Sequence, residues 1–334
     1  MKRTLIFIML FVMLAAALCG CSAEPAESSS GTPTRLNIGM LAGPTGVGAA
    51  KLMSDAAAGS TQDSYNFTVF SSPDEVTAKF IRGELDAAAV PTNLAAVLYK
   101  KTDGKARIAA INTLGVLYVL TAQGTQVASV EDLRGKTVYS SGLGAVPEYA
   151  LNYILDAAGI RDEVEVIYET EHDAVIADLA AGRAKVAVLP EPKVTAALAK
   201  VEGLTVALDL TDEWSKAAKD SGEGSVLTMG CVIVNSDFEA AHPEAVVNFL
   251  HRYENSVAYM INGDNLDTAA ALCEQFGIIP KAAIAKKAIP NCNMTFISGA
   301  GMKESVSAFY DVLYNYDPAS VGGALPDDEF YYGN

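Results

Sequence analysis

Short apolar runs alternate with amphipathic stretches along much of the chain. The runs 35–41 and 135–141 have the length and apolar content of buried strands, and each leads through a glycine-rich loop into a helical stretch. The second of these helices carries an apolar stripe at Leu151, Ile154 and Leu155. Strands that alternate with helices form parallel sheets covered on both faces, so the pattern predicts an α/β fold with mostly parallel sheets.

An internal repeat indicates that this unit occurs twice. Segment 83–92 aligns without a gap on segment 182–191, and each is flanked by helical stretches. In both, a glycine ends a helix, an apolar strand follows, and a proline, Pro91 or Pro190, stops the strand at its carboxyl end. The repeat predicts two similar lobes. Ligands of such sheets bind beyond the carboxyl ends of the strands, which places the expected site at these loops.

The last third of the chain reads as one strand followed by helices. Segment 225–235 is a strand candidate, and the segments 243–261 and 301–314 carry apolar stripes at helical spacing. We interpret both stripes as core that packs against the first lobe.

The chain is therefore expected to cross between lobes twice, near 114–121 and near 226–234, and paired crossings of this kind form hinges. The predicted organisation is a first lobe from 35–115 and 230–334 and a second lobe from 118–225.

The first residues have the pattern of an export signal. A basic end precedes a short apolar run in residues 1–20, and the run is shorter than a bilayer-spanning helix. Leu18-Cys19-Gly20-Cys21 resembles the bacterial lipobox, which predicts lipidation of Cys21; an ordinary secretory signal is the alternative. Segment 21–34 reads as a flexible, lipid-anchored tether. The expected location is the outer face of the cell membrane, at the cell surface or in the periplasm.

The net charge and the number of cysteines exclude some classes of function and fold. The net charge of −16 would repel the phosphates of nucleic acids, so we expect no nucleic-acid partner. The cysteines after Cys21 are too few for a disulfide framework. A Cys273–Cys292 disulfide and buried free thiols both remain open at this stage, with Cys231 as the third cysteine.

Motifs for catalysis are incomplete. The loop 43–48 has the glycine spacing of a phosphate-binding loop, but Ala49 and Ala50 stand where lysine and serine or threonine are required. No Gly-x-Ser-x-Gly motif occurs. The histidines lack zinc-site spacing and are interpreted as surface or capping residues: His172, His242 and His251. We therefore expect no enzymatic activity, no cofactor and no metal site.

Several motifs together resemble one family. They are the lipobox, the loop Gly43-Pro44-Thr45-Gly46, the segment ending at Pro91, Asp132-Leu133-Arg134-Gly135-Lys136, the Ser141-Gly142 loop before Pro147-Glu148, and Leu189-Pro190-Glu191-Pro192. This set is similar to the receptors of ABC importers for nitrate, sulfonates, taurine and thiamine precursors, the NMT1/THI5-like group.

The resemblance implies a two-lobed, periplasmic-binding-protein-like (type II) α/β fold that closes on one small solute. It also implies a monomeric receptor that performs no chemistry and delivers its solute to an ABC permease and ATPase complex. An enzyme or a non-transport sensor on the same fold is the alternative, because fold does not determine function.

Loop matching supplies the candidate solute-binding residues. The first lobe contributes Gly43, Pro44, Thr45, Gly46, Ser71, Ser72, Thr92, Asn93, Asn112 and Thr113. The second lobe contributes Ser140, Ser141, Gly142, Gly144, Glu148 and Glu191.

The chemistry of these residues leaves the solute open. Backbone N–H groups at Thr45-Gly46 and Ser141-Gly142 suit a small anion, although the same residues also cap helices. Glu148 and Glu191 favour a ligand with N–H donors or a cationic part, and a carboxylate in a first helical turn also stabilises the helix. A taurine-like zwitterion or an aminopyrimidine fits this mixture better than nitrate. Trp214 would stack on a flat ligand or pack in the protein.

Overall fold

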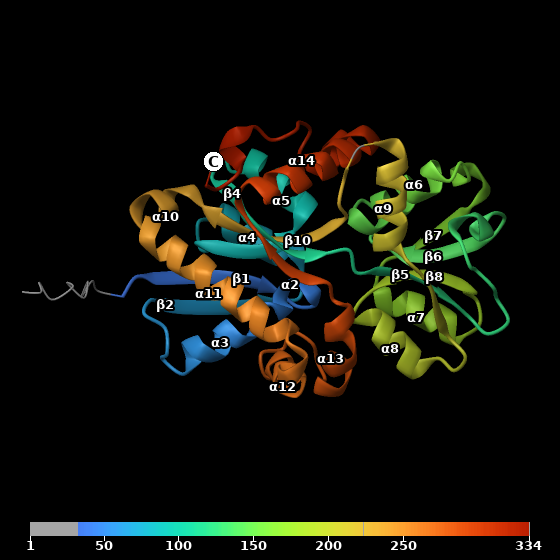
Figure 1. Cartoon of the computed structure of the whole chain (residues 1–334), viewed down its shortest axis with the longest axis horizontal. Helices are drawn as coiled ribbons and strands as arrows, with labels where there is room; N and C mark the ends of the chain where they lie inside the picture. Colours follow the sequence, from blue (N-terminus) through green and yellow to red (C-terminus); the bar gives the residue numbers. More distant parts are fainter. Residues whose placement is uncertain (1–32, 223, 334) are drawn as a thin grey trace, which may run out of the picture. The chain divides into compact units, whose positions relative to one another are not determined.

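The computed structural model describes residues 33–222 and 224–333 (Figure 1). The expected signal peptide, the lipidation site Cys21 and most of the expected tether lie outside the described residues. Arg35–Asn334 pack as one unit. No helix among the described residues has the length and apolarity needed to cross a membrane.

Two sheets organise this unit. Sheet A has the strand order β11-β4-β10-β3-β1-β2, and sheet B has the order β7-β6-β8-β5-β9. The strands of sheet A are β1 (Arg35–Leu41), β2 (Ser64–Phe70), β3 (Ala87–Pro91), β4 (Ala106–Leu114), β10 (Thr228–Asn235) and β11 (Met294–Ile297). Those of sheet B are β5 (Leu117–Thr121), β6 (Thr137–Ser141), β7 (Glu165–Glu169), β8 (Val186–Pro190) and β9 (Thr205–Asp209).

The repeat seen in the sequence is a repeat of topology. The order β2-β1-β3-β10-β4 in sheet A corresponds to β7-β6-β8-β5-β9 in sheet B. The register agrees, because Gly230 of β10 pairs with Pro91 and Leu117 of β5 pairs with Pro190. The prediction of two similar α/β lobes is confirmed.

The strands that arrive from the other sheet run against their neighbours. In sheet A, β1 pairs in parallel with β2 and β3, whereas β10 is antiparallel to both β3 and β4. In sheet B, β6 pairs in parallel with β7 and β8, whereas β5 is antiparallel to β8 and β9. The chain leaves sheet A at the carboxyl end of β4 and enters sheet B beside the carboxyl end of β8, where Leu117 pairs with Pro190. The strand β5 therefore runs antiparallel to β8. The expected parallel pairing therefore holds within each repeat and not at the crossing strands.

Helices cover both faces of each sheet (Figure 1). On sheet A, α3 (Ala50–Ala57) and α11 (Pro243–Ile261) lie on one face, and α4 (Pro73–Ile81), α5 (Thr92–Lys101) and α14 (Gly299–Tyr316) on the other. On sheet B, α6 (Val146–Ala157) and α9 (Leu210–Ser221) lie on one face, and α7 (His172–Ala180) and α8 (Lys193–Lys200) on the other. The remaining helices are α2 (Pro44–Val47), α10 (Ser236–Ala241), α12 (Leu266–Gln275) and α13 (Ala282–Ala288), with the 3-10 turns η1 (Val130–Leu133), η2 (Arg161–Glu163), η3 (Gly263–Asn265), η4 (Ile289–Asn291), η5 (Pro318–Val321) and η6 (Asp328–Phe330).

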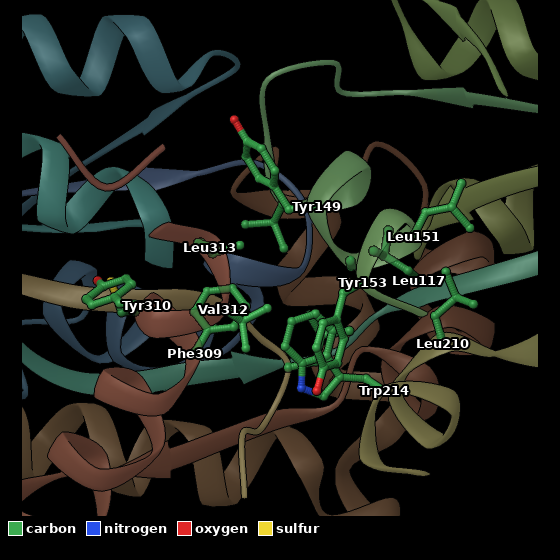
Figure 2. Close-up of a cluster of buried hydrophobic side chains, with 14 of the residues drawn as sticks. Leu117, Tyr149, Leu151, Tyr153, Leu210, Trp214, Phe309, Tyr310, Val312 and Leu313 are labelled. Atoms are coloured by element: carbon green, nitrogen blue, oxygen red, sulfur yellow. The ribbon is translucent and has the colours of Figure 1, made fainter. Parts of the chain in front are cut away.

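One hydrophobic core runs continuously from sheet A to sheet B. It joins the α4, α5 and α14 side of sheet A to the α6 and α9 side of sheet B, while the opposite faces of the two sheets have separate cores. Trp214 of α9 lies in this shared core between Tyr153 of α6 and Phe309 of α14, with ring centroids 4.3 and 5.7 Å away (Figure 2).

The shared core changes two interpretations. The stripe of α11 packs on sheet A as expected, but α14 packs on sheet A and also meets α9 of sheet B through Phe309. Trp214 is fully buried and its Nε1 donates to the carbonyl of Ser225 at 3.2 Å, so this ring packs in the protein and is not available to stack on a ligand.

The three described cysteines are free and buried: Cys231, Cys273 and Cys292. The structure therefore agrees with the interpretation as buried free thiols and has no Cys273–Cys292 disulfide.

Candidate functional site

The candidate residues gather at the carboxyl edges of the two sheets. In sheet A, they lie in the segments that follow β1, β2 and β3 and in the last residues of β4, and in sheet B they lie at the end of β6 and in the segments that follow β6 and β8. These are the edges where ligands of open α/β sheets bind.

A polar cluster forms the sheet A part of the site. The Asn112 amide nitrogen donates to the Thr45 carbonyl at 3.0 Å and to the Tyr253 hydroxyl oxygen at 2.9 Å, and the Thr113 hydroxyl donates to the Asn112 amide oxygen at 3.0 Å. Gly230 lies beneath this cluster. A Cβ there would lie 2.7 Å from the Asn112 amide oxygen, closer than real Cβ contacts, and 3.0 Å from the Thr45 side chain, which is tight. A larger residue would therefore have to displace Asn112.

The glycines of the first loop have structural reasons of their own. Gly43 has a φ of 94°, and its N–H donates to the Ile278 carbonyl at 2.8 Å. A Cβ on Gly46 would lie 2.1 Å from the Leu41 carbonyl oxygen, so no side chain fits at this turn into α2. Pro44 is the first residue of that short helix.

The other predicted sheet A residues make hydrogen bonds outside this cluster or are exposed. Ser71 is exposed, and the Ser72 hydroxyl caps α4 by accepting from the Asp74 N–H at 3.2 Å. The Thr92 carbonyl accepts from the Tyr310 hydroxyl at 2.6 Å, which ties it to α14 on the opposite face of the sheet from α11. The Asn93 amide points the same way, donating to the Ser320 carbonyl at 3.4 Å. The Thr92 hydroxyl is buried with no hydrogen-bond partner among the described residues.

In sheet B, the loop after β6 is stabilised by hydrogen bonds from nearby side chains. Gly142 and Gly144 both have positive φ, at 85° and 73°. The Gly144 N–H donates to the Glu148 carboxylate at 2.6 Å, and the buried Ser140 hydroxyl donates to the Ser141 carbonyl at 3.3 Å. Glu148 thus holds this loop in place.

The Ser141 hydroxyl contacts a histidine, His172, that was not among the predicted site residues. It shares a hydrogen bond with Nδ1 of His172, the first residue of α7. Burial, and then the charge of Lys193, lower the pKa of His172, so its neutral form is favoured. The interpretation of His172 as a mere surface or capping residue is wrong: it lies 31 positions from Ser141 in the chain and beside it in the fold.

Glu191 is buried and its oxygens are occupied. Thr195 donates to it through its N–H at 3.1 Å and through its hydroxyl at 3.0 Å, and the Asn291 side chain also hydrogen-bonds to it. Burial raises the pKa of Glu191, and these hydrogen bonds act in the opposite direction. Glu191 therefore caps the first turn of α8.

A segment of the C-terminal region brings the carboxyl edges of the two sheets together. The Tyr118 hydroxyl of β5 donates to the Asn291 carbonyl at 3.1 Å, and the Asn293 amide donates to the Gly115 carbonyl at 3.1 Å. Asn291 also reaches Glu191. These residues were not predicted as site residues, because no local sequence pattern marks a loop that packs against another lobe.

Lys193 was also missed. It is the first residue of α8, and its ammonium lies 2.7 Å from the Asp173 carboxylate. The signal was present in the sequence, since Lys193 follows Glu191 by two positions in a loop already singled out.

A separate pocket of about 420 Å3 opens at the amino end of sheet B. It lies at the opposite edge from the candidate loops, and no predicted site residue lines it. Its lining comprises Thr125, Lys136, Thr137, Tyr139, Glu165, Ile167, Arg183, Lys185 and Val186. Across residues 33–222 and 224–333, no group of histidine, cysteine, aspartate and glutamate is arranged to hold a metal ion.

Comparison with known proteins identifies the fold. Residues 106–265 match the family described as NMT1/THI5 like. The chain is similar to an ABC transporter structure from Parabacteroides distasonis, with 23% identity, a TM-score of 0.74 and coverage of 89% of this chain and 98% of that chain.

It is also similar to the periplasmic aliphatic sulphonate binding protein SsuA from Escherichia coli, with 15% identity, a TM-score of 0.71 and coverage of 90% and 92%. The alkanesulfonate-binding protein SsuA from Xanthomonas axonopodis pv. citri, bound to MOPS, gives 15% identity and a TM-score of 0.62, with coverage of 89% and 96%. No curated protein matches the sequence. These findings confirm the expected resemblance and the two-lobed, type II periplasmic-binding-protein-like fold.

Proposed function

We propose that this chain, which carries an NMT1/THI5-like family segment over residues 106–265, is the extracytoplasmic solute-binding receptor of an ABC importer. In this proposal it binds one small polar solute between its lobes, performs no chemistry and hands the solute to a permease and ATPase complex. A sulfonate or taurine-like compound is the proposed solute class, and a pyrimidine precursor of thiamine is the alternative.

Polar residues at the carboxyl edges of both sheets carry this proposal. Asn112 and Thr113 lie at the carboxyl edge of sheet A, and Ser141 and His172 lie at the corresponding edge of sheet B. Asn291 connects the two edges through Tyr118 and Glu191. A solute held between such edges contacts both lobes, and its binding energy then favours their closure.

Thermal unfolding with a solute panel tests this function. The chain without its leader, residues 22–334, is heated with taurine, ethanesulfonate, nitrate and an aminopyrimidine. A solute at a hundredfold excess over its Kd adds about 2.7 kcal/mol to the free energy of unfolding. Mass spectrometry should recover the bound compound unchanged, whereas a converted product would favour an enzyme.

We further propose that lipid on Cys21 anchors the protein to the outer face of the membrane. Metabolic labelling with a palmitate analogue should mark the full-length protein and the matched variant Cys19→Ser, and should fail with Cys21→Ser. Equal labelling of both variants would argue against the anchor.

A further inference from the structure

We infer that Ser141, His172 and Lys193 form an anion-binding subsite at the carboxyl edge of sheet B, and that the solute presents a sulfonate or carboxylate group to it. This inference rests on the proposed function and specifies the solute class. It differs from the expectation based on sequence, in which Glu148 and Glu191 favoured a cationic part.

The first observation is the paired arrangement of Ser141 and His172. Ser141 ends β6 and is 2% exposed, and its hydroxyl occupies Nδ1 of His172. The two ring nitrogens of histidine lie on different sides of the ring, so a bond at Nδ1 leaves Nε2 for another partner. No residue in the described part of the chain hydrogen-bonds to Nε2. When the serine hydroxyl donates to Nδ1, Nε2 carries the proton and is a donor to an anionic oxygen.

The second observation is the nearby positive charge. Lys193 lies close enough to His172 to lower its pKa, and it is held by Asp173, the next residue after His172. The side chain of Asp173 is 76% exposed, so water competes for this ion pair and its net strength is small. An anionic solute can therefore take Lys193 as a partner without breaking a buried pair.

The third observation concerns the helix starts. His172 opens the nine-residue helix α7 and Lys193 the eight-residue helix α8. The N-cap residue of α7, Glu171, makes no side-chain hydrogen bond to its helix, whereas in α8 the Thr195 N–H is already bonded to Glu191. The N–H groups that open α7 favour a negative charge beside them. Together with Lys193 and His172, they make the potential at this edge favourable for an anion.

The carboxylates of the site do not cancel this preference. Glu148 accepts from the Gly144 N–H, and Glu191 accepts from Thr195 and Asn291. Both are committed to holding protein groups. Asp173 and Glu171 flank His172, and Asp173 is paired with Lys193, so a cationic solute would have to compete with that ammonium. In a zwitterion such as taurine, the sulfonate end would take this subsite.

Calorimetric titration of residues 22–334 with ethanesulfonate, propionate, taurine, ethylamine and an aminopyrimidine tests the inference. The anionic compounds and taurine should bind, and ethylamine should not. Lys193→Gln should weaken their binding about tenfold or more, since charge-assisted hydrogen bonds are the stronger ones, and Lys193→Arg should restore most of it. Asp173→Asn should tighten binding, because it removes the competitor for Lys193.

Lys185→Gln is the matched control. It removes the same charge from the same lobe at the opposite end of β8, and it should leave the affinities unchanged. Thermal unfolding of each unliganded variant separates loss of binding from loss of fold. If the aminopyrimidine binds and Lys193→Gln does not weaken it, the receptor function stands and the anion subsite is overturned. If no compound binds, the proposed function fails and the subsite with it.

Discussion

Removal of the Trp214 side chain should destabilise both lobes together. A buried tryptophan removes about 200 Å2 from water, which corresponds to about 5 kcal/mol at 25 cal/mol per Å2. Trp214 is fully buried against Tyr153 and Phe309, and its indole N–H satisfies the Ser225 carbonyl. Alanine retains part of the contact, so Trp214→Ala should lower the free energy of unfolding by about 4 kcal/mol.

Urea unfolding followed by far-ultraviolet circular dichroism measures this loss. The control Leu198→Ala truncates a side chain that is 40% exposed on α8 and should cost less than about 1 kcal/mol. Trp214→Phe, which keeps a ring and loses the N–H, should fall between the two. If Trp214→Ala costs no more than the control, the shared core does not hold the lobes together.

A double-mutant cycle isolates the contact between the lobes. Trp214 belongs to α9, which packs on sheet B. Phe309 belongs to α14, which packs on sheet A and contacts Trp214. The double variant Trp214→Ala/Phe309→Ala should cost less than the sum of the two single changes, by about 0.5–1.5 kcal/mol. Simple additivity would mean that the two rings stabilise their lobes independently.

Three further predictions follow from single sites. Gly230→Ala should displace Asn112 and lower the free energy of unfolding by about 1–3 kcal/mol in urea titrations, whereas Gly263→Ala, where a Cβ meets nothing, should stay within about 0.5 kcal/mol. The pKa of His172 is lower in the folded protein than in the unfolded chain, so the unfolded chain binds the proton more readily and the free energy of unfolding should fall as pH drops through about 6.5. His172→Gln should flatten this pH dependence in unfolding curves measured from about pH 7.5 to 5.5. An unchanged slope would contradict the prediction. In residues 22–334, Ellman's reagent should find no reactive thiol in the native protein and all three in urea, and a reductant should leave Tm unchanged, because the cysteines are free and buried: Cys231, Cys273 and Cys292.

Much of the fold was predictable because its signals are local. Runs of apolar residues, the glycines at positive φ that end α4 and α7, and the prolines that end β3 and β8 all act within a few residues. The repeat predicted two similar lobes, and the two sheets have corresponding strand orders. The antiparallel crossing strands were not predicted, because their direction depends on which edge the chain enters.

The candidate site was predictable at the level of loops and not of partners. Ser141 was singled out from its loop, but its partner His172 belongs to another βα unit. Asn112 was singled out near a crossing, but Tyr253 lies 141 positions later. The roles of Glu148 and Glu191 as acceptors for protein groups also required the neighbouring loops to be in place.

The two α/β repeats, the loops at their carboxyl ends and the acidic net charge follow from the sequence alone, because these depend on composition and short-range periodicity. The charged groups that face the site and the contact of Trp214 with both lobes are known only from the folded chain. Those facts depend on contacts between residues distant in the chain, which arise when sheets order their strands and helices pack across them.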